Sequence, residues 1–374
     1  MQKGIKVVFP FLLFLITFQC SFAWGFWAHQ RINRLAVFTL PPEMFPLYKT
    51  HIEYLTEHAV DPDKRRYAVE WEATRHYIDV DHYGEYPFTE VPRKWYKAVE
   101  KFSEDTLNAY GIVPWHIQVE MTRLTKAFKH KELDRILKIS ADLGHYVADG
   151  NVPLHTTENY NGQLTNQKGI HGLWESRLPE IYGMEWDYFV GKSQYLDDPL
   201  VTAWENALTA HICLDSVLGF EENLTQTFPS DQKYSYEKRG NVSKKVYSRE
   251  FCEAYHHQLN GQVERRIRRS VLMVGSFWFT AWVNAGQPDL SELTDKPIEV
   301  KEAEVKRKKK LKIIDREAGE IGAVAPPQNY HQLFDCQHHH GHEQLHEEIG
   351  RVTFRLHAKN GERQKIKSIA AIRG

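Results

Sequence analysis

The sequence contains few cysteines and almost no excess of charge of either sign. Only four cysteines occur among the 374 residues, and no two of them form a Cys-x-x-Cys pair. A small disulfide scaffold is therefore excluded, and a zinc site built from thiolates is not expected. The formal net charge of -1 argues against a basic nucleic-acid-binding surface spread over the whole molecule. With 42% hydrophobic and 26% charged residues, the composition also excludes collagen-like and fully disordered chains.

The apolar run over residues 7–18 is too short to cross a membrane as a helix, which takes roughly 20 residues. Two lysines precede this run, and small residues follow at Ser21 and Ala23, which is the pattern of a secretory signal peptide. We therefore predict a signal peptide over residues 1–23 and a secreted or periplasmic protein. A lipoprotein anchor at Cys20 is the alternative, but the glutamine before it fits that motif poorly.

A secreted chain enters a compartment that permits disulfides. After cleavage of the signal peptide, three cysteines would remain: Cys213, Cys252 and Cys336. A bond between Cys213 and Cys252 is one candidate, and the sequence does not establish whether the geometry allows it.

Apolar residues recur at helical spacing from about residue 24 to 290, and few segments alternate as strands do. One apolar stripe runs from Leu133 to Gly150, another helix is expected to open at Pro114, and a third spans about 265–285. The centre of the third helix is apolar on every face but closely bounded by polar residues, which favours a buried core helix over a membrane span. We predict an all-α fold with no transmembrane helix in the mature chain.

The character of the sequence changes beyond residue 300. Lys306–Lys310 is an unbroken basic run, and His338–His342 is a histidine-rich segment of low complexity. Little apolar periodicity follows, so we predict a basic, low-complexity tail over residues 301–374 that is weakly ordered or separately packed. We assign no function to its histidines.

The strongest functional pattern is a set of five candidate metal ligands between residues 145 and 175. His145 and Asp149 are four residues apart on the predicted helix, so their side chains share one face. His155 follows a break in that helix, and His171 and Glu175 repeat the four-residue spacing. Imidazole and carboxylate groups without thiolate are typical of catalytic zinc, which keeps one position open for water.

Several segments together resemble the superfamily that unites zinc-dependent phospholipase C with the single-strand-specific zinc nucleases. The matching segments are Trp24-Gly25-Phe26-Trp27-Ala28-His29, HAVDPDKR with Asp61, RHYID with His76, HYVAD with the PLH that follows it, and HGLWE. They occur in order across most of the chain before residue 290. The resemblance implies a compact, multi-helix domain of the phospholipase C/nuclease type over residues 24–300, with three zinc ions in its cleft.

The resemblance also implies which residues hold each ion. The first zinc would be held by Asp61, His76, His145 and Asp149, the second by His155, His171 and Glu175, and the third by His29, Asp149 and the amino and carbonyl groups of Trp24. Trp24 can serve only after signal removal, because an amine within a peptide bond does not coordinate zinc. Asp63 is the alternative to Asp61, and motif order favours Asp61. Asp61 and Asp149 are the catalytic candidates.

Four further residues are candidates for binding the substrate: Lys64, Arg65, Tyr77 and Asp79. Lys64 or Arg65 would bring a cation to the phosphate, as a nearby arginine does in the nuclease branch. A solvated basic turn is an equally good interpretation of these two residues. Tyr77 and Asp79 match positions near which the nuclease branch stacks and hydrogen-bonds a base, and an ordinary core role is the alternative.

We expect a zinc-dependent phosphodiester hydrolase, because zinc generates a nucleophile from water near neutral pH and stabilises charge on phosphoryl oxygens. The substrate would be a phospholipid head group or single-stranded nucleic acid. Glu175 favours the phospholipase C-like group, since the nucleases usually have aspartate there. A single-strand-specific nuclease is the alternative, favoured by the step from Trp24 to His29 and by the RHYID segment. A secreted zinc-binding protein without activity is a second alternative, and no protein partner is implied.

Overall fold

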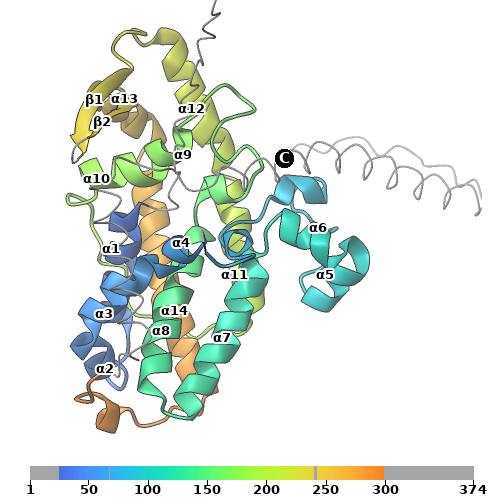
Figure 1. The fold of residues 1–374 in the computed structure, drawn as a ribbon, viewed down its shortest axis with the longest axis vertical. Helices are drawn as coiled ribbons and strands as arrows, with labels where there is room; N and C mark the ends of the chain where they lie inside the picture. Colours follow the sequence, from blue (N-terminus) through green and yellow to red (C-terminus); the bar gives the residue numbers. More distant parts are fainter. Residues whose placement is uncertain (1–24, 67, 240–241, 299–374) are drawn as a thin grey trace, which may run out of the picture. The chain divides into compact units, whose positions relative to one another are not determined.

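The computed structural model describes residues 25–66, 68–239 and 242–298, which are predominantly helical (Figure 1). The α-helices are α1 (Phe26–Ala36), α2 (Phe45–Thr50), α3 (Ile52–Glu57), α4 (Asp61–Arg65), α5 (Trp95–Phe102), α6 (Glu104–Ala109), α7 (Val113–Lys129), α8 (Leu133–Asp149), α9 (Ile170–Gly172), α10 (Leu178–Tyr182), α11 (Pro199–His211), α12 (Leu214–Thr227), α13 (Arg249–Leu259) and α14 (Gln262–Asn284). The short 3-10 helices are η1 (Val37–Thr39), η2 (His58–Val60), η3 (Ala73–Arg75), η4 (Val80–Tyr83), η5 (Pro153–His155) and η7 (Ser291–Leu293), and η6 (Leu173–Arg177) is a π-helical turn. The predicted signal peptide, Trp24 and the tail with Cys336 lie outside the described residues.

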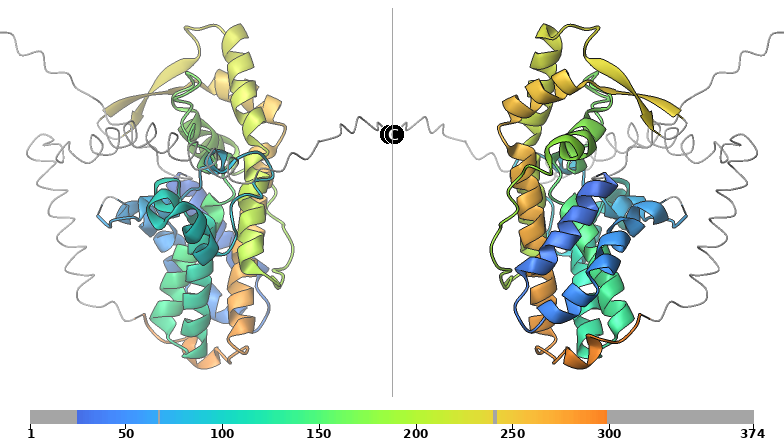
Figure 2. Two further views of the ribbon diagram at one scale, coloured as in Figure 1. Left: turned by 90° about the vertical axis from the view of Figure 1, so that its right-hand side faces the viewer. Right: turned by 90° about the vertical axis from the view of Figure 1, so that its left-hand side faces the viewer.

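Four long helices, α1, α7, α8 and α14, pack side by side around the core (Figures 1 and 2). Pro114 stands in the first turn of α7, α8 ends just before Gly150, and α14 begins at Gln262, slightly earlier than predicted. The apolar centre of α14 buries Phe277 and Trp278 completely, so it belongs to the protein core as expected. Within the described ranges, no helix has the length and apolarity needed to span a bilayer. The prediction of a mainly helical fold is confirmed.

Two glycines allow the helices to approach one another closely. A Cβ atom on Gly144 of α8 would lie 2.1 Å from Oδ1 of Asn33 on α1, and one on Gly275 of α14 would lie 1.9 Å from Oγ1 of Thr39. The amide of Asn33 donates to the carbonyl oxygen of Ala141 at 3.1 Å, which ties α1 to α8. This close packing brings the histidine on α1 beside the histidine that follows Gly144.

One antiparallel hairpin, not predicted from the sequence, joins β1 (Tyr234–Arg239) to β2 (Val242–Tyr247), with Tyr234 opposite Tyr247. Tyr247 packs against Phe251 of α13, and its hydroxyl donates to Glu221 of α12 at 3.4 Å. The hairpin therefore rests on the two helices that lie beside it in Figure 1.

Candidate metal centre

Buried histidine, aspartate and glutamate side chains converge in the interior of the described part of the chain. They come from α1, α4, α8, η5 and the continuous segment of α9 and η6, and from His76, which follows η3. They form three groups, and within each group the potential ligand atoms all lie within 4.8 Å of one another. The groups are His29, His145 and Asp149; Asp63, His76 and His145; and His155, His171 and Glu175. The structure thus brings together every predicted ligand that it describes except Asp61.

Asp149, in the last turn of α8, lies at the junction of these groups. Its Oδ2 atom is 2.9 Å from Nδ1 of His76 and 3.2 Å from Nε2 of His145. Its Oδ1 atom is 3.3 Å from Nε2 of His29 and 3.8 Å from Nδ1 of His155. One carboxylate therefore faces imidazoles on two sides, as a bridging ligand would.

The third group is built around a π-helical turn. His171 on α9 and Glu175 in η6 belong to one continuous helical segment, and their Nε2 and Oε2 atoms are 2.8 Å apart. Nε2 of His155 lies 3.2 Å from Nε2 of His171. Single π turns within helices are frequent at functional sites. Gly25, where the described chain begins, donates its backbone N–H to the carbonyl of Glu175 at 3.4 Å and so ties α1 to this turn.

Asp63, and not Asp61, faces the histidines. Oδ1 of Asp63 lies 3.9 Å from Nδ1 of His76 and 4.0 Å from Nε2 of His145. Asp61 instead accepts hydrogen bonds from His58 and from Lys64, which are three residues before and after it. These local partners hold the Asp61 carboxylate away from the cluster. The structure therefore places Asp63, and not the favoured Asp61, among the buried histidines.

Several polar atoms of the cluster are buried without a hydrogen-bond partner. They include both carboxylate oxygens of Asp63 and of Glu175, Oδ1 of Asp149 and both ring nitrogens of His29. Burying such groups costs free energy unless a counter-charge compensates them. The converging imidazole nitrogens and carboxylate oxygens fit a divalent cation, which would satisfy them. The described part of the chain therefore contains buried histidine, aspartate and glutamate groups that could bind metal ions.

Burial and neighbouring charges set the protonation of the histidines. Burial, reinforced by His145, lowers the pKa of His29 to about 4. Burial and then the guanidinium of Arg66 lower the pKa of His171 to about 4. Both imidazoles are thus neutral at neutral pH, which is the form that coordinates metal. His145 differs, because Asp149 and Asp63 outweigh the effect of burial and raise its pKa to about 9.

The surroundings of Glu175 and Asp149 shift the pKa values of these two carboxyl groups in opposite directions. Burial raises the pKa of Glu175 to about 8, with a further contribution from Asp149. Burial also acts on Asp149, but His145 and His155 outweigh it and hold the pKa of this carboxyl well below its usual range. In the metal-free protein at pH 7, Asp149 is therefore ionised, whereas Glu175 is mostly protonated.

Backbone carbonyls orient two of the histidine rings. Nδ1–H of His145 donates to the carbonyl of Ala59 at 2.8 Å, and Nδ1–H of His155 donates to the carbonyl of His76 at 2.6 Å. In the neutral form of each ring, Nε2 is then the atom with the free lone pair. Such outer hydrogen bonds fix the orientation of metal-binding histidines.

Three basic residues follow one another at the end of α4, and each lies beside a carboxylate: Lys64, Arg65 and Arg66, the last of which was not predicted as a site residue. Lys64 pairs with Asp61, and its side chain is 54% exposed. Arg65 donates to Asp142 at 3.0 Å and to Glu72 at 3.1 Å, so its charge is already compensated. The role of Lys64 and Arg65 in binding a phosphate stays a prediction. Nη1 of Arg66 lies 3.7 Å from Oδ1 of Asp63.

Tyr77 and Asp79 lie on the segment that follows His76. The hydroxyl of Tyr77 donates to the carbonyl of Ala109 at 3.2 Å, and the backbone N–H of Asp79 donates to the carbonyl of Tyr110 at 2.7 Å. Burial and then the carboxylate of Asp81 raise the pKa of Asp79 well above its usual value. A protonated carboxyl group is able to donate a hydrogen bond. The role of both residues in substrate binding stays a prediction.

Cys213 and Cys252 are free thiols, so the candidate disulfide is not formed. Cys213 lies between α11 and α12, where its Sγ donates to the carbonyl of Thr209 at 3.4 Å. Cys252 is buried in α13, near the carbonyl of Tyr247. The partner of Cys213 lies on α11, and that of Cys252 lies at the end of β2.

No protein-family model matches the chain, and no curated protein matches it either.

Proposed function

We propose that this protein is a zinc-dependent hydrolase of phosphodiester bonds, of the phospholipase C-like group in the superfamily that its sequence resembles. The observation that carries the proposal is the buried cluster in which Asp149 faces histidines on both sides and the oxygens of Asp63 and Glu175 have no hydrogen-bond partner. Imidazole and carboxylate ligands without thiolate are the donor set of catalytic zinc. Bound zinc would supply a water of pKa near 7 and would neutralise phosphoryl oxygens.

In this proposal, the residues of the cluster would hold three zinc ions, and Asp149 would be shared by two of them. One zinc would be held by Asp63, His76, His145 and Asp149, a second by His155, His171 and Glu175, and a third by His29, Asp149 and the freed amino end at Trp24. The carbonyls of Ala59 and His76 keep His145 and His155 in the orientation that ligation needs. Arg66 places a positive charge beside Asp63, where it would bind a phosphoryl oxygen.

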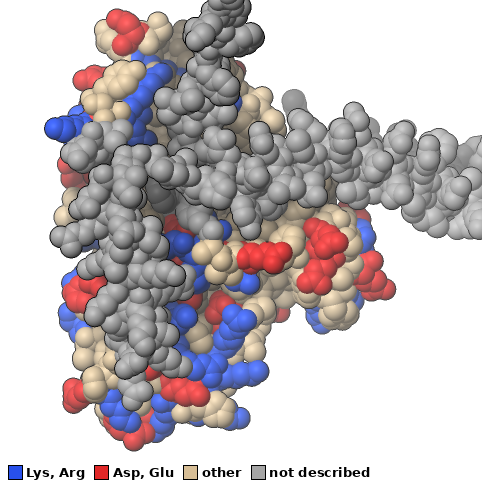
Figure 3. Space-filling view, viewed as in Figure 1, with Lys and Arg blue, Asp and Glu red and all other residues tan. Residues whose placement is uncertain are grey.

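The surroundings of the cluster favour an apolar substrate. The ring of Tyr160 lies 5.9 Å from that of His171, and Tyr160 is 49% exposed. Leu164, in the same loop, is 67% exposed, and its backbone N–H is held by Oδ1 of Asn159 at 2.8 Å. Where described residues are visible in Figure 3, acidic and basic side chains are interspersed. The exposed tyrosine and leucine of this loop support a phospholipid substrate.

The proposal is tested with purified, signal-free chain that has been loaded with zinc and assayed for metal content. We expect cleavage of a chromogenic phosphodiester and of phosphatidylcholine. Cleavage of single-stranded DNA without cleavage of lipid would favour the nuclease. A fully loaded protein that cleaves none of the three substrates would be an inert zinc-binding protein, and the proposal would be wrong.

A pair of variants connects activity to the cluster. His145→Ala removes a ligand candidate of two groups, so we expect lower zinc content and no measurable turnover. His130→Ala removes an exposed histidine that follows α7 and is the matched control. Unchanged zinc content in His145→Ala would remove this residue from the metal site.

A further inference from the structure

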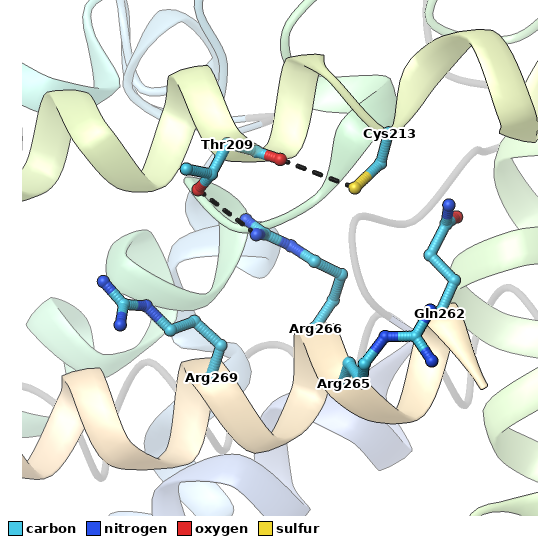
Figure 4. Close-up of a pocket in the computed structure, with 6 residues that line it drawn as sticks. All are labelled: Thr209, Cys213, Gln262, Arg265, Arg266 and Arg269. Carbon is cyan, nitrogen blue, oxygen red and sulfur yellow. Dashed lines mark hydrogen bonds between the residues drawn. The ribbon is translucent and has the colours of Figure 1, made fainter.

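A second polar site lies between α11, the start of α12 and α14. It is a cavity of about 420 Å³ lined by Thr209, Cys213, Gln262, Arg265, Arg266 and Arg269 (Figure 4). Cavities of this size accommodate small molecules. None of these residues belongs to the metal cluster, so the cavity is a feature that the proposed function does not use.

Arg266 is held in the wall of this cavity by hydrogen bonds. Its side chain is buried, with 8% of the residue exposed, and it donates only to uncharged groups. Nε donates to the carbonyl of Asn151 at 2.8 Å, and Nη2 donates to Oδ1 of Asn151 and to the carbonyl of Asn206, both at 3.0 Å. Burial lowers its pKa to about 10, so Arg266 stays charged at neutral pH. A buried guanidinium without a counter-ion favours an anion nearby.

Arg265 and Arg269 are the exposed cations of the cavity. Nε of Arg269 donates to Oδ1 of Asn206 at 3.2 Å, and Arg265 donates to the carbonyl of Asn260. Burial lowers the pKa of Arg269, and the carboxylate of Glu205 acts in the opposite direction. Among the described residues, however, no carboxylate forms an ion pair with any of the three arginines that line the cavity.

Another arginine of α14 shows that this lack of pairing is local. Arg268, on the same helix, forms an ion pair with Asp187 at 2.8 Å and donates to the carbonyl of Phe189 at 3.1 Å. The helix therefore presents a compensated charge on one side and uncompensated charges toward the cavity.

We propose that this cavity binds a phosphate group, either as inorganic phosphate or as a phosphomonoester. Arg265 and Arg269, which lie on either side of Arg266 in Figure 4, would each be able to pair with its oxygens, since guanidinium groups recognise phosphate through paired charge-assisted hydrogen bonds. Thr209 and Gln262 add uncharged hydrogen-bonding groups to the same wall. The bound anion would compensate Arg266, which also holds Asn151 in the segment between Asp149 and His155.

Cys213 provides a local reporter for this site, because its half-buried thiol lines the cavity (Figure 4). Iodoacetamide labelling of Cys213 in the full, zinc-loaded chain is followed at that residue by mass spectrometry. We expect saturating inorganic phosphate to slow labelling at least about fivefold, because occupancy protects a site in proportion to one plus the ratio of ligand to Kd. Phosphate bound at the metal cluster would not protect this thiol. The readout is thus independent of the proposed function.

Two variants test whether the phosphate that slows the labelling of Cys213 binds at the arginines of the cavity. Arg265→Gln combined with Arg269→Gln removes two exposed charges and is expected to abolish the protection by phosphate. Arg268→Gln, which changes the charge of the same helix on its paired side, should retain protection within about twofold. Equal slowing by sodium chloride at matched ionic strength, no slowing in the wild type, or full protection in the double variant would overturn the proposal.

The source of the phosphate is distinguished by two further probes. Protection of Cys213 by glycerol phosphate would identify a soluble phosphomonoester as the ligand. Protection by vesicles of phosphatidic acid, but not by glycerol phosphate, would identify a lipid head group. Either result, obtained together with protection by inorganic phosphate, supports a phosphate site, and the absence of protection by inorganic phosphate refutes it.

Discussion

Two buried polar regions lie next to each other in this protein, and they differ in how their hydrogen bonds are satisfied. In the first, which we term the closed network, Glu72 accepts from Arg65 at 3.1 Å, from Arg75 at 2.6 Å and from the hydroxyl of Tyr146. Arg65 also donates to Asp142 at 3.0 Å. Each carboxylate in this network has a positively charged partner from the chain itself.

The candidate metal site also contains buried carboxylates and shares α8 with the closed network, yet several of its polar atoms have no hydrogen-bond partner. Asp142 and Tyr146 of α8 belong to the closed network, whereas His145 and Asp149 of α8 belong to the cluster. In the cluster, buried oxygens of Asp149 and Glu175 lack hydrogen-bond partners. The comparison teaches that burial and charge alone do not indicate a ligand site. A better indicator of such a site is a set of buried polar atoms that lack hydrogen-bond partners and converge on one point.

The largest contrast is expected between two aspartates of α8. Asp149→Asn removes the carboxylate shared by the cluster, so we expect loss of at least one bound metal ion and a fall in phosphodiester hydrolysis of roughly a thousandfold. Asp142→Asn weakens the ion pair with Arg65 in the closed network. It should lower the free energy of unfolding by about 2 kcal/mol and leave metal content unchanged. Metal analysis and chemical denaturation measure both effects, and equal metal loss in the two variants would contradict the distinction.

The second contrast lies within α4. Asp63→Asn should reduce metal-dependent activity by roughly a hundredfold, because Asp63 faces His76 and His145. Asp61→Asn should change activity less than about threefold, since Asp61 pairs with His58 and Lys64 instead. Activity and zinc content of the two purified variants decide between them. The reverse order of effects would restore Asp61 as the ligand.

The third prediction tests the closed network by itself. Arg65→Met leaves Glu72 and Asp142 without one of their partners, so we expect the free energy of unfolding to fall by about 3 kcal/mol. Lys64→Met, at the exposed neighbouring position, should change it by less than about 1 kcal/mol. Zinc content should be unaffected in both. Loss of zinc in Arg65→Met would show that the two regions are coupled.

The smallest expected effect is the pH dependence of metal uptake. The pKa values of about 8 for Glu175 and about 9 for His145 mean that the metal-free cluster holds both protons at pH 7. Ligation requires their loss, so zinc affinity should rise with pH, by about tenfold per pH unit for each proton released. Calorimetry in buffers of different ionisation enthalpy measures the number of protons. Glu175→Gln should release one proton fewer, and a pH-independent affinity would contradict the assignment.

Much of the helical fold was predictable because periodicity is a local property of the chain. The stripe from Leu133 to Gly150 and the proline at position 114 marked α8 and α7 correctly. The hairpin was not predicted, since its strands are rich in polar residues and are anchored by distant groups. Arg177, for example, forms a bidentate pair with Glu237 of β1. Nothing in the sequence around Arg177 or Glu237 indicates that these two residues form a pair.

The spacing of His145 and Asp149, and of His171 and Glu175, was enough to nominate four of the eight clustered residues, because residues four apart on a helix share a face. His29 and His76 were nominated only through the family resemblance. The choice of Asp63 over Asp61, and of Arg66 over Arg65 as the cation beside the cluster, required the folded chain. Which of two neighbouring charges is buried and which is already paired depends on side chains from other segments, such as Glu72 and Asp142 around Arg65. Those neighbours are set by packing, and packing is not encoded in the spacing of any single segment.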